Sequence, residues 1–459
     1  SYCQYNDVKY IVNWGRPNII NKWWENSDYC SNSLNDKDCY LLFISSENQD
    51  CCYWYIVLNC QNCFDILWWA YCQNCFDCTR VINCYNCQFL TDCENTRDSK
   101  FLIDCIWCSD CMFSIWQVNK QYLILNIQYT KEEYKKIYED ISKNKEILNS
   151  YKDKFEELKK NSFRKNMNIE NSEKSFGNNL TNCKNTLYCY ELNDSENSKY
   201  FFDWAYDQDS YDVYLSGGTD IKNFCTLIYE SENVVNVYKS LFCSTVWYCK
   251  NIYYSDNCYN CSDLFGCVWL RDKQYCILNK HYTKEQYEQL VPKVIEYMKN
   301  TWERWEFFPI SKSLFGYNET VANQYYPLDR ESALSQWFNW QTKEYPVNVP
   351  DWIELVPAQD LPDNIHDVDD EILKKAVVCE VSWKPFRIIK PELDFYRKHN
   401  LPLPRKHPDI RHMERMSKRA PRQLYLRECD NCGKQVVSVY PADSEFKVYC
   451  EECYNKETY

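Results

Sequence analysis

Glycine is scarce in this sequence. The 459 residues include 7 glycines, against 17 tryptophans and 40 tyrosines, although glycine normally makes up about 7 % of a chain. Histidine is also rare, with five residues, and neither a paired-histidine motif nor a Ser-His-Asp pattern occurs. So few glycines and histidines argue against a phosphate-binding loop and against a nucleotide-binding α/β fold. We therefore expect a protein that is not an enzyme.

Long apolar runs are missing too. No stretch of about 18 apolar residues occurs, so we expect no membrane span and no membrane partner. No signal-peptide pattern opens the chain either. The chain begins at Ser1 rather than Met, so we expect a fragment that lacks its true N-terminus. The formal charge of −13 argues against tight nucleic-acid binding by the chain as a whole.

Cysteine, by contrast, is abundant. Of the 30 cysteines, 16 precede residue 112, nine lie between 183 and 276, and five follow residue 378. Such density indicates either a secreted disulfide scaffold or a reduced protein that uses thiols as metal ligands and core residues. Disulfide scaffolds are usually short, so the length of this chain favours the reduced alternative, and with it a cytoplasmic location.

The first group of cysteines follows an arithmetic repeat. Cys30, Cys51, Cys72 and Cys93 are each 21 residues apart. A constant step without helical spacing predicts a β-solenoid, here with one coil per 21 residues. The predicted fold is mainly β with α: residues 1–25 form an N-terminal segment, 26–128 a first solenoid, and 129–178 a helix and linker.

The second cysteine group repeats the first at an offset of 153 residues. It predicts a second solenoid over 179–281 and a closing helix over 282–300. Thr130 with Glu133, and Thr283 with Gln286, form capping boxes that open a helix after each copy. Such helices would cover the unpaired strand edges at the solenoid ends. Residues 301–376 show short helices and turns without recognisable chemistry.

The solenoid thiols have two interpretations. Their Cys-x2-Cys pairs could form a row of metal or iron–sulfur sites, or cysteine could serve as a small buried core residue. The second copy favours the core, because aliphatic residues replace thiols there; Cys60, Cys84, Cys93 and Cys111 correspond to Val213, Val237, Val246 and Leu264. Asparagines before the second cysteine of a pair, which tolerate left-handed backbone, predict coil corners at Asn62, Asn74 and Asn86.

The last four cysteines have the spacing of a zinc site. Cys429-x2-Cys432 and Cys450-x2-Cys453 are separated by 17 residues that alternate like a hairpin. Four thiolates hold Zn²⁺ tetrahedrally and leave no open position, so residues 423–459 predict a structural zinc ribbon. Residues 377–422 predict a degenerate sibling in which only Cys379 and His407 could ligate. Two ligands do not hold structural zinc, and we expect that site to be empty.

A basic segment covers most of the degenerate module and reaches the start of the zinc ribbon. Between Lys384 and Arg427 there are 13 Lys or Arg against four Asp or Glu. This excess could contact phosphates of RNA or DNA, with Tyr425 and Tyr440 nearby for stacking. The candidate phosphate-contacting residues are Lys384, Arg387, Arg405, Lys406, Arg411, Arg415, Lys418, Arg419 and Arg422.

Several tryptophans stand where a turn usually needs glycine. Cys379-Glu-Val-Ser-Trp383 parallels Cys429-Asp-Asn-Cys-Gly433, and the residue after a zinc knuckle often needs a positive φ. One hypothesis is a gene from a lineage that reads UGA as glycine, translated here with UGA as tryptophan. The alternative is an unusual but true composition.

Two resemblances accompany these patterns. Residues 379–416 resemble the "probable zinc-ribbon" domain, although Ser382, His407 and Ile410 depart from its ligand pattern. Nearly the whole chain is similar to cysteine-rich repeat proteins of candidate-phyla bacteria, a family with no assigned activity. The similarity is carried by LRDKQYCILNKHYTKEQY (270–287), FFPISKSLFGYNETVA (307–322) and CEECYNKETY (450–459). Some members carry a CaiB/BaiF label, which implies CoA transfer, but no acyl-carrying Asp stands out here.

Three functions follow as hypotheses. The first is a non-enzymatic zinc-binding scaffold that binds a protein partner through its solenoid surfaces and basic zinc-ribbon tail. The alternative is a nucleic-acid-associated protein that binds RNA or DNA through residues 384–427. The third is an enzyme of unknown type.

Overall fold

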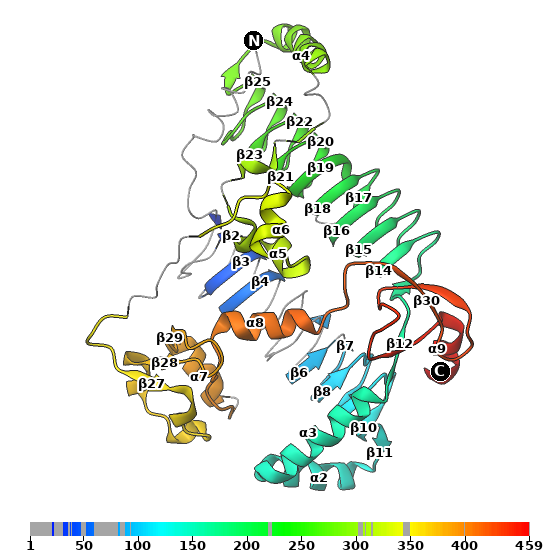
Figure 1. Ribbon diagram of the computed structural model, residues 1–459, viewed down its shortest axis with the longest axis vertical. Coiled ribbons are helices and arrows are strands. Elements are labelled where there is room, and N and C mark those ends of the chain that lie inside the picture. The colour runs from blue at the N-terminus through cyan, green and yellow to red at the C-terminus, as the bar shows by residue number, and fades with distance from the viewer. Residues whose placement is uncertain are drawn as a thin grey trace. The chain divides into compact units, whose positions relative to one another are not determined.

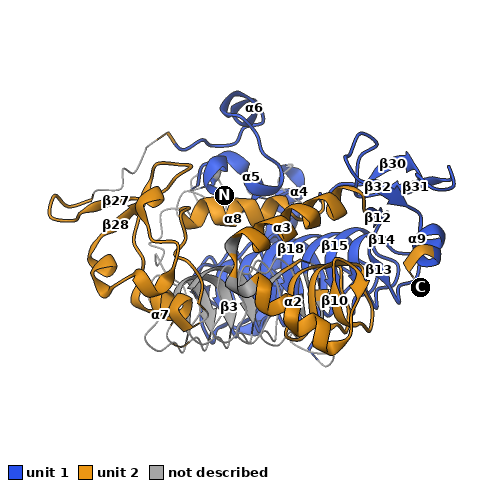
Figure 2. Cartoon of the chain, turned by 90° about the horizontal axis from the view of Figure 1, so that it is seen from below, with its two compact units in different colours: residues 1–16, 163–341, 421–456 blue, residues 17–162, 342–420, 457–459 orange. Residues whose placement is uncertain are grey.

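The computed structural model (Figure 1) is mainly sheet with several helices, and the chain divides into two compact units (Figure 2). Unit 1 comprises residues 1–16, 163–341 and 421–456, and unit 2 comprises 17–162, 342–420 and 457–459. Each unit therefore combines distant parts of the sequence. The structure describes residues 21–22, 31–34, 37, 39–46, 52–58, 81–82, 88–91, 93–218, 223–301, 306–307, 309–313, 315–342, 349–398 and 400–458.

Unit 1 is built on a 14-stranded sheet, here called the unit-1 stack. Neighbouring strands pair in parallel and largely in chain order, and only the final pair, β25 with β26, is antiparallel. The strands are β13 (Ile169–Glu170), β14 (Phe176–Thr181), β15 (Leu187–Asn193), β16 (Lys199–Ala205), β17 (Asp207–Gln208), β18 (Tyr211–Gly217), β19 (Cys225–Val235), β20 (Tyr238–Leu241), β21 (Ser244–Trp247), β22 (Lys250–Tyr253), β23 (Asp256–Tyr259), β24 (Ser262–Phe265), β25 (Gln274–Ile277) and β26 (Lys280–His281).

The register of these strands is twelve residues, not 21. Lys250 pairs with Ser262, and Ser262 pairs with Gln274. Between β18 and β19 the step is 18, where Tyr211 pairs with Tyr229. The prediction of a 21-residue coil is therefore wrong for the described residues.

A three-residue period explains both the register and the error. Asn182, Asn185 and Tyr188 have φ of 55°, 54° and 55°, and the residue after each of them is buried: Cys183, Thr186 and Cys189. Every third residue thus turns left-handed and the next side chain points inward. The sequence steps of 21 and 153 are multiples of three. Two residues separated by such a step therefore point the same way, although they do not pair with each other.

The inward side chains satisfy the backbone of the stack. The Ser231 hydroxyl donates to the Tyr229 carbonyl at 2.9 Å and accepts the Cys243 N–H at 3.1 Å. Cysteine makes the same contacts: Cys249 Sγ donates to the Trp247 carbonyl at 3.2 Å and accepts the Cys261 N–H, also at 3.2 Å. Thiols here are core residues, as predicted, and the aliphatic counterparts are buried with them: Val213, Val237, Val246 and Leu264.

Left-handed asparagines form ladders on the outside of the stack. Asn185 donates to Asn197 at 3.1 Å, and Asn197 donates to Asp209 at 2.9 Å. The structure thus confirms that asparagine marks left-handed turns. The named examples Asn62, Asn74 and Asn86, and the core cysteines Cys60 and Cys84, lie outside the described residues.

We call each level of the unit-1 stack, about twelve residues of chain, a rung. Helix α4 (Lys284–Asn300) covers the last rung. It begins with the predicted capping box of Thr283 and Gln286. Its buried face packs against Phe265 and Ile277 of the stack and is formed by Tyr287, Val291, Val294 and Met298. Short helices follow: η1 (Ile310–Lys312), η2 (Tyr317–Glu319), α5 (Val321–Tyr325) and α6 (Arg330–Ser335).

Unit 2 repeats the same architecture in its described strands. Parallel pairs again lie twelve residues apart, as in Lys100 with Met112 and Ser109 with Gln121. The strands are β1 (Asn21–Lys22), β2 (Ser31–Leu34), β3 (Tyr40–Ser46), β4 (Cys52–Leu58), β5 (Val81–Ile82), β6 (Gln88–Thr91), β7 (Cys93–Glu94), β8 (Lys100–Ile103), β9 (Ser109–Ile115), β10 (Gln121–Ile124) and β11 (Ile127–Gln128). Helices α2 (Lys131–Lys143), with its predicted capping box, and α3 (Lys145–Lys160) pack on Ile124 and Phe113.

A second core in unit 2 holds the module around Cys379. Its buried residues include Val377, Ile388, Leu393 and Tyr396. The elements are β27 (Leu355–Pro357), η3 (Ala358–Asp360), η4 (Ile365–Asp367), η5 (Asp370–Lys374), β28 (Ala376–Val378), β29 (Pro385–Phe386), α7 (Lys390–Lys398) and α8 (Pro408–Ser417).

The predicted linker before residue 179 is structured. After α3, residues 163–178 form β12 (Phe163–Lys165), β13 and the start of β14. Asn171 and Lys174 already follow the three-residue period, with φ of 45° and 50°, so the stack begins about ten residues earlier than composition indicated. In the described part of the chain, no helix is both long and apolar enough to cross a membrane.

Candidate metal centre

The four C-terminal cysteines come together in unit 1. Cys429 and Cys432 lie on the turn between β30 (Tyr425–Glu428) and β31 (Gln435–Ser438). Cys450 follows β32 (Lys447–Tyr449), and Cys453 lies on α9 (Glu451–Thr458). Their four Sγ atoms lie within 4.8 Å of one another; Cys432 is exposed and the other three are buried. Among the described residues, this group could hold a metal ion.

Local hydrogen bonds prepare these thiols for ligation. Gly433, with φ of 72°, donates its N–H to the Cys429 carbonyl at 2.9 Å and closes the turn. The Cys450 N–H donates to Cys429 Sγ at 3.2 Å. Burial raises the pKa of Cys429, but N–H donors from Cys450 and the turn outweigh it and lower that pKa to about 6. A thiol that ionises this readily is suited to a metal.

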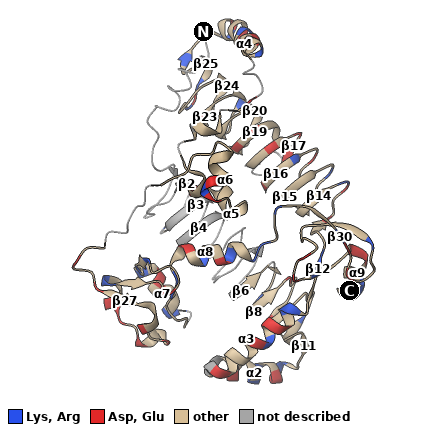
Figure 3. Ribbon diagram, viewed as in Figure 1, with Lys and Arg blue, Asp and Glu red and all other residues tan. Residues whose placement is uncertain are grey.

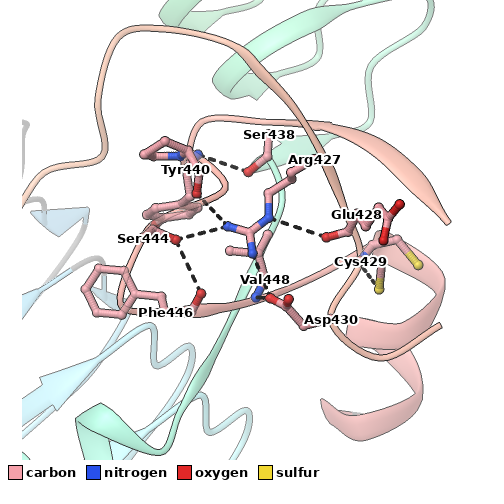
Figure 4. A network of polar contacts seen from close by, with 11 residues as sticks. Arg427, Glu428, Cys429, Asp430, Ser438, Tyr440, Ser444, Phe446 and Val448 are labelled. Carbon is pink, nitrogen blue, oxygen red and sulfur yellow. Dashed lines mark hydrogen bonds and ion pairs between the residues drawn. The ribbon is translucent and has the colours of Figure 1, made fainter. Parts of the chain in front are cut away.

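A buried arginine supports the turn from behind (Figure 4). Arg427 donates to Asp430 Oδ2 at 2.8 Å, to the Pro441 carbonyl at 2.9 Å and to Ser444 Oγ at 3.0 Å. Asp430 Oδ2 also accepts the Val448 N–H at 2.5 Å. This network connects the Cys429 turn to β32, which leads into Cys450. Arg427 is one of the basic residues counted in the segment 384–427, but no pattern in the sequence indicates that it supports this turn.

The tetracysteine module packs against the strand that precedes the unit-1 stack. Strand β12 pairs in parallel with β32, and the Phe163 ring stacks on Tyr449 with centroids 4.6 Å apart. Lys165 Nζ lies 2.8 Å from Glu451 Oε1. Asn166 donates to the Val437 carbonyl at 2.8 Å and accepts the Val439 N–H at 3.1 Å. Residues more than 270 positions apart in sequence thus share one small sheet.

Arg422 provides a second attachment within unit 1. Its guanidinium forms an ion pair with Asp203 of β16, and both side chains are buried. The guanidinium also lies over the Tyr325 ring, 3.8 Å from its centroid, and over Phe202 at 5.6 Å. Burial with charge and ring partners makes Arg422 a structural anchor.

The predicted degenerate site keeps the same turn as the tetracysteine site. Cys379 N–H donates to the Lys384 carbonyl at 3.1 Å, as Cys429 N–H does to Lys434 at 2.9 Å. The N–H groups of Val381 and Ser382 both lie 3.4 Å from Cys379 Sγ. His407 caps α8, where its Nδ1 accepts the Asp409 N–H at 3.2 Å. Among the described residues, Cys379 and His407 do not join a group of three or more potential ligands.

Many candidate phosphate-contacting residues are engaged within the fold. Arg411 pairs with the buried Glu392 at 3.4 Å, and Arg415 is 3 % exposed. Figure 3 shows acidic and basic residues interspersed along α8. Further contacts join Arg387 to the Leu373 carbonyl, Arg405 to Asp363 and Lys406 to Glu414, while Lys384 and Lys418 are exposed and Arg419 is half-buried.

No family model matches this chain, and no curated protein matches it. Among solved structures, a protein from Desulfovibrio desulfuricans G20 that is assigned as an acetyltransferase is 10 % identical, and the match covers 52 % of this chain and 62 % of that one. The TM-score of that match is 0.12, so it carries no argument about fold or function.

Proposed function

We propose that this protein is a zinc-stabilised scaffold that binds a partner protein. We also propose that the unit-1 stack and the parallel strands of unit 2 are β-solenoid modules with twelve-residue coils. The observation that carries the proposal is an aromatic patch on the unit-1 stack. Its members are 38–47 % exposed: Phe176, Leu187, Tyr188, Tyr200 and Tyr211. Exposed apolar clusters rich in tyrosine are typical of protein interfaces.

The patch lies on a part of the stack that the rest of the unit leaves open. Tyr188 and Tyr200 stack with centroids 5.3 Å apart, one rung above the other. Residues two or three positions further along the same strands are covered; Tyr190 is 4 % exposed and Asp203 is fully buried, near Arg422. The patch is thus a rigid, preformed surface, which keeps the entropy cost of binding low.

Zinc is the metal that the tetracysteine site fits. Four sulfurs at about 2.3 Å from Zn²⁺ in a tetrahedron are about 3.8 Å apart, and Cys432 Sγ lies 3.8 Å from Cys450 Sγ. A closed set of four thiolates leaves no position for substrate, so the ion would hold the fold together. Elemental analysis should find one zinc per chain, lost in Cys429→Ser and retained in Cys379→Ser.

The scaffold proposal is tested by comparing bound proteins. The full chain and the Tyr188→Ala/Tyr200→Ala variant are each used as bait, with Tyr238→Ala/Tyr248→Ala as control because those tyrosines are 48 % and 42 % exposed on the same stack. We expect partners that the control retains and the patch variant loses. Identical sets of bound proteins would refute the aromatic patch as the binding surface.

The nucleic-acid alternative has less support. Arg411, Arg415 and Arg422 are buried, and several other basic residues are paired with acidic ones. These three arginines are therefore not available for phosphates. Filter binding of the full chain to RNA or DNA over a salt series should show no salt-steep binding; a steep salt dependence would favour the alternative.

A further inference from the structure

The unit-1 stack has an open edge at its first rung, residues 169–176. Strand β13 is the first strand of the 14-stranded sheet, and among the described strands it pairs only with β14. The opposite end of the stack is covered by α4. An uncovered strand edge presents main-chain donors and acceptors that another chain can pair with.

The interior rungs show which main-chain groups point toward the edge. The N–H of each left-handed residue donates to the preceding rung, as Asn182 does to Glu170 and Asn185 to Glu173. The residue after each left-handed residue accepts, through its carbonyl, an N–H from the preceding rung. Glu173 N–H donates to the Cys183 carbonyl at 2.9 Å, and Phe176 N–H donates to the Thr186 carbonyl at 2.8 Å.

The edge rung repeats this conformation without a rung before it. Asn171 and Lys174 are left-handed, with φ of 45° and 50°. By the same geometry, their N–H groups and the carbonyls of Ser172 and Ser175 point out of the stack. No backbone hydrogen bond to these four groups occurs among the described residues. All four residues line a cavity of about 650 Å³.

One residue of the tetracysteine module also lines this cavity. Glu451, directly after Cys450, lines it together with Met167, Ile169 and Phe176. The ion pair between Glu451 and Lys165, and the pairing of β32 with β12, hold that residue in place. The tetracysteine module therefore borders the open edge at Glu451.

We propose that this edge binds an extended peptide segment of a partner protein as an added rung. The inference rests on the proposed scaffold function and names how a partner binds. Two donors and two acceptors repeat every three residues, so a chain in the same three-residue conformation can pair with all four. Ser172 Oγ already accepts the Cys183 N–H at 2.9 Å, so the matching peptide carries Ser, Thr or Cys at every third position. Phe176, 46 % exposed, offers an apolar contact.

A peptide that copies a rung is the direct probe. We would label residues 181–193, with Cys183→Ser and Cys189→Ser, and titrate the zinc-loaded full chain while measuring fluorescence anisotropy. In the stack, the N–H groups of Lys184 and Leu187 donate to the carbonyls of Ser195 and Ser198; bound at the edge in the same parallel register, they would donate to the carbonyls of Ser172 and Ser175, respectively. The control peptide carries Lys184→Pro and Leu187→Pro, which removes both donors.

We expect saturable binding of the first peptide and about tenfold weaker binding of the proline peptide. Phe176→Ala should weaken binding about threefold or more, whereas Tyr238→Ala, 48 % exposed elsewhere on the stack, should not. Amide exchange at Asn171 and Lys174 should slow when the peptide is present. Equal binding of the two peptides, or no saturable binding, would overturn the inference.

The two proposals fail in different ways. If neither peptide binds but Tyr188→Ala/Tyr200→Ala still loses partners, the edge inference is wrong and the scaffold function stands. If the rung peptide binds with the expected selectivity while the patch variant keeps every partner, the edge and not the aromatic patch is the binding surface.

Discussion

At the scale of single residues, tryptophan occupies backbone that normally favours glycine. Trp383 has φ of 57° and its N–H donates to the Cys379 carbonyl at 3.1 Å, while the equivalent Gly433 has φ of 72° and donates at 2.9 Å. Left-handed backbone costs a residue with a Cβ about 1–2 kcal/mol. Trp383 is 75 % exposed, so little packing offsets that cost.

We therefore predict that Trp383→Gly stabilises the protein by about 1 kcal/mol, measured as an upward shift in the unfolding temperature. Trp352→Gly is the control, because Trp352 is 79 % exposed and is not among the residues with positive φ. That control should be neutral or destabilising. Equal shifts in both variants would show that loss of exposed tryptophan, and not relief of backbone strain, explains the effect.

The same position tests the codon hypothesis. If UGA is read as glycine in the native source, mass spectrometry of the natively produced protein should find glycine at residue 383. Tryptophan there would contradict the hypothesis and leave an unusual composition as the explanation. Trp269 and Trp337 also have positive φ, of 64° and 66°. The hypothesis predicts glycine at these two positions as well.

The buried thiols of the unit-1 stack should resist alkylation. Burial raises the pKa of Cys243 to about 11 and that of Cys225 to about 12. A thiol with a pKa near 11 is ionised in roughly one molecule in three thousand at pH 7.5. Peptide mapping after iodoacetamide treatment should find both unlabelled until denaturant is added. Exposed Cys432, after zinc removal, is the positive control; equal labelling of Cys225 in the folded protein would contradict the core assignment.

At the scale of elements, attachment of the tetracysteine module depends on a buried charge pair. Removing one partner of such a pair costs about 3–5 kcal/mol, because the other charge stays buried and unpaired. We predict that Arg422→Leu loses stability of this order in chemical denaturation, since Asp203 is fully buried. The double variant Arg422→Leu/Asp203→Leu should recover much of the loss. Similar losses in both variants would indicate that packing on Tyr325, and not charge, dominates.

The sequence predicted elements better than it predicted their pairing. The capping boxes at Thr130 and Thr283 and the four-cysteine cluster are local patterns, and the structure confirms them. The 21-residue step was misleading because any multiple of three keeps the same side chains pointing inward, whereas paired residues mostly lie twelve positions apart. Ion pairs such as Arg422 with Asp203 join residues 219 positions apart, and no local pattern signals such a partner.

At the scale of the whole molecule, the order of segments along the chain differs from their grouping in space. The module around Cys379 groups with the first set of strands in unit 2, and the tetracysteine module groups with the second set in unit 1. Each unit thus contains one set of parallel strands and one knuckle-type module. Unit 2 holds its module with an apolar core that includes Cys379 itself, whereas around the tetracysteine site the buried cluster consists of Cys429, Cys450 and Cys453 with Val436 and Tyr449.

This difference predicts that metal removal acts on one unit only. With a small apolar cluster, we expect residues 425–458 to need the ion to fold, because binding energy at a structural zinc site is folding energy. Chelation should raise amide exchange in β30 and β32, and in β12 because it pairs with β32. The helices α2 and α7 of unit 2 should keep their protection, since their cores contain no tetracysteine site among the described residues. Hydrogen-exchange mass spectrometry with and without chelator measures all of these segments in one experiment. Unchanged exchange in β32 after complete zinc loss would mean that its pairing with β12 and the Arg427 network hold this module without the metal.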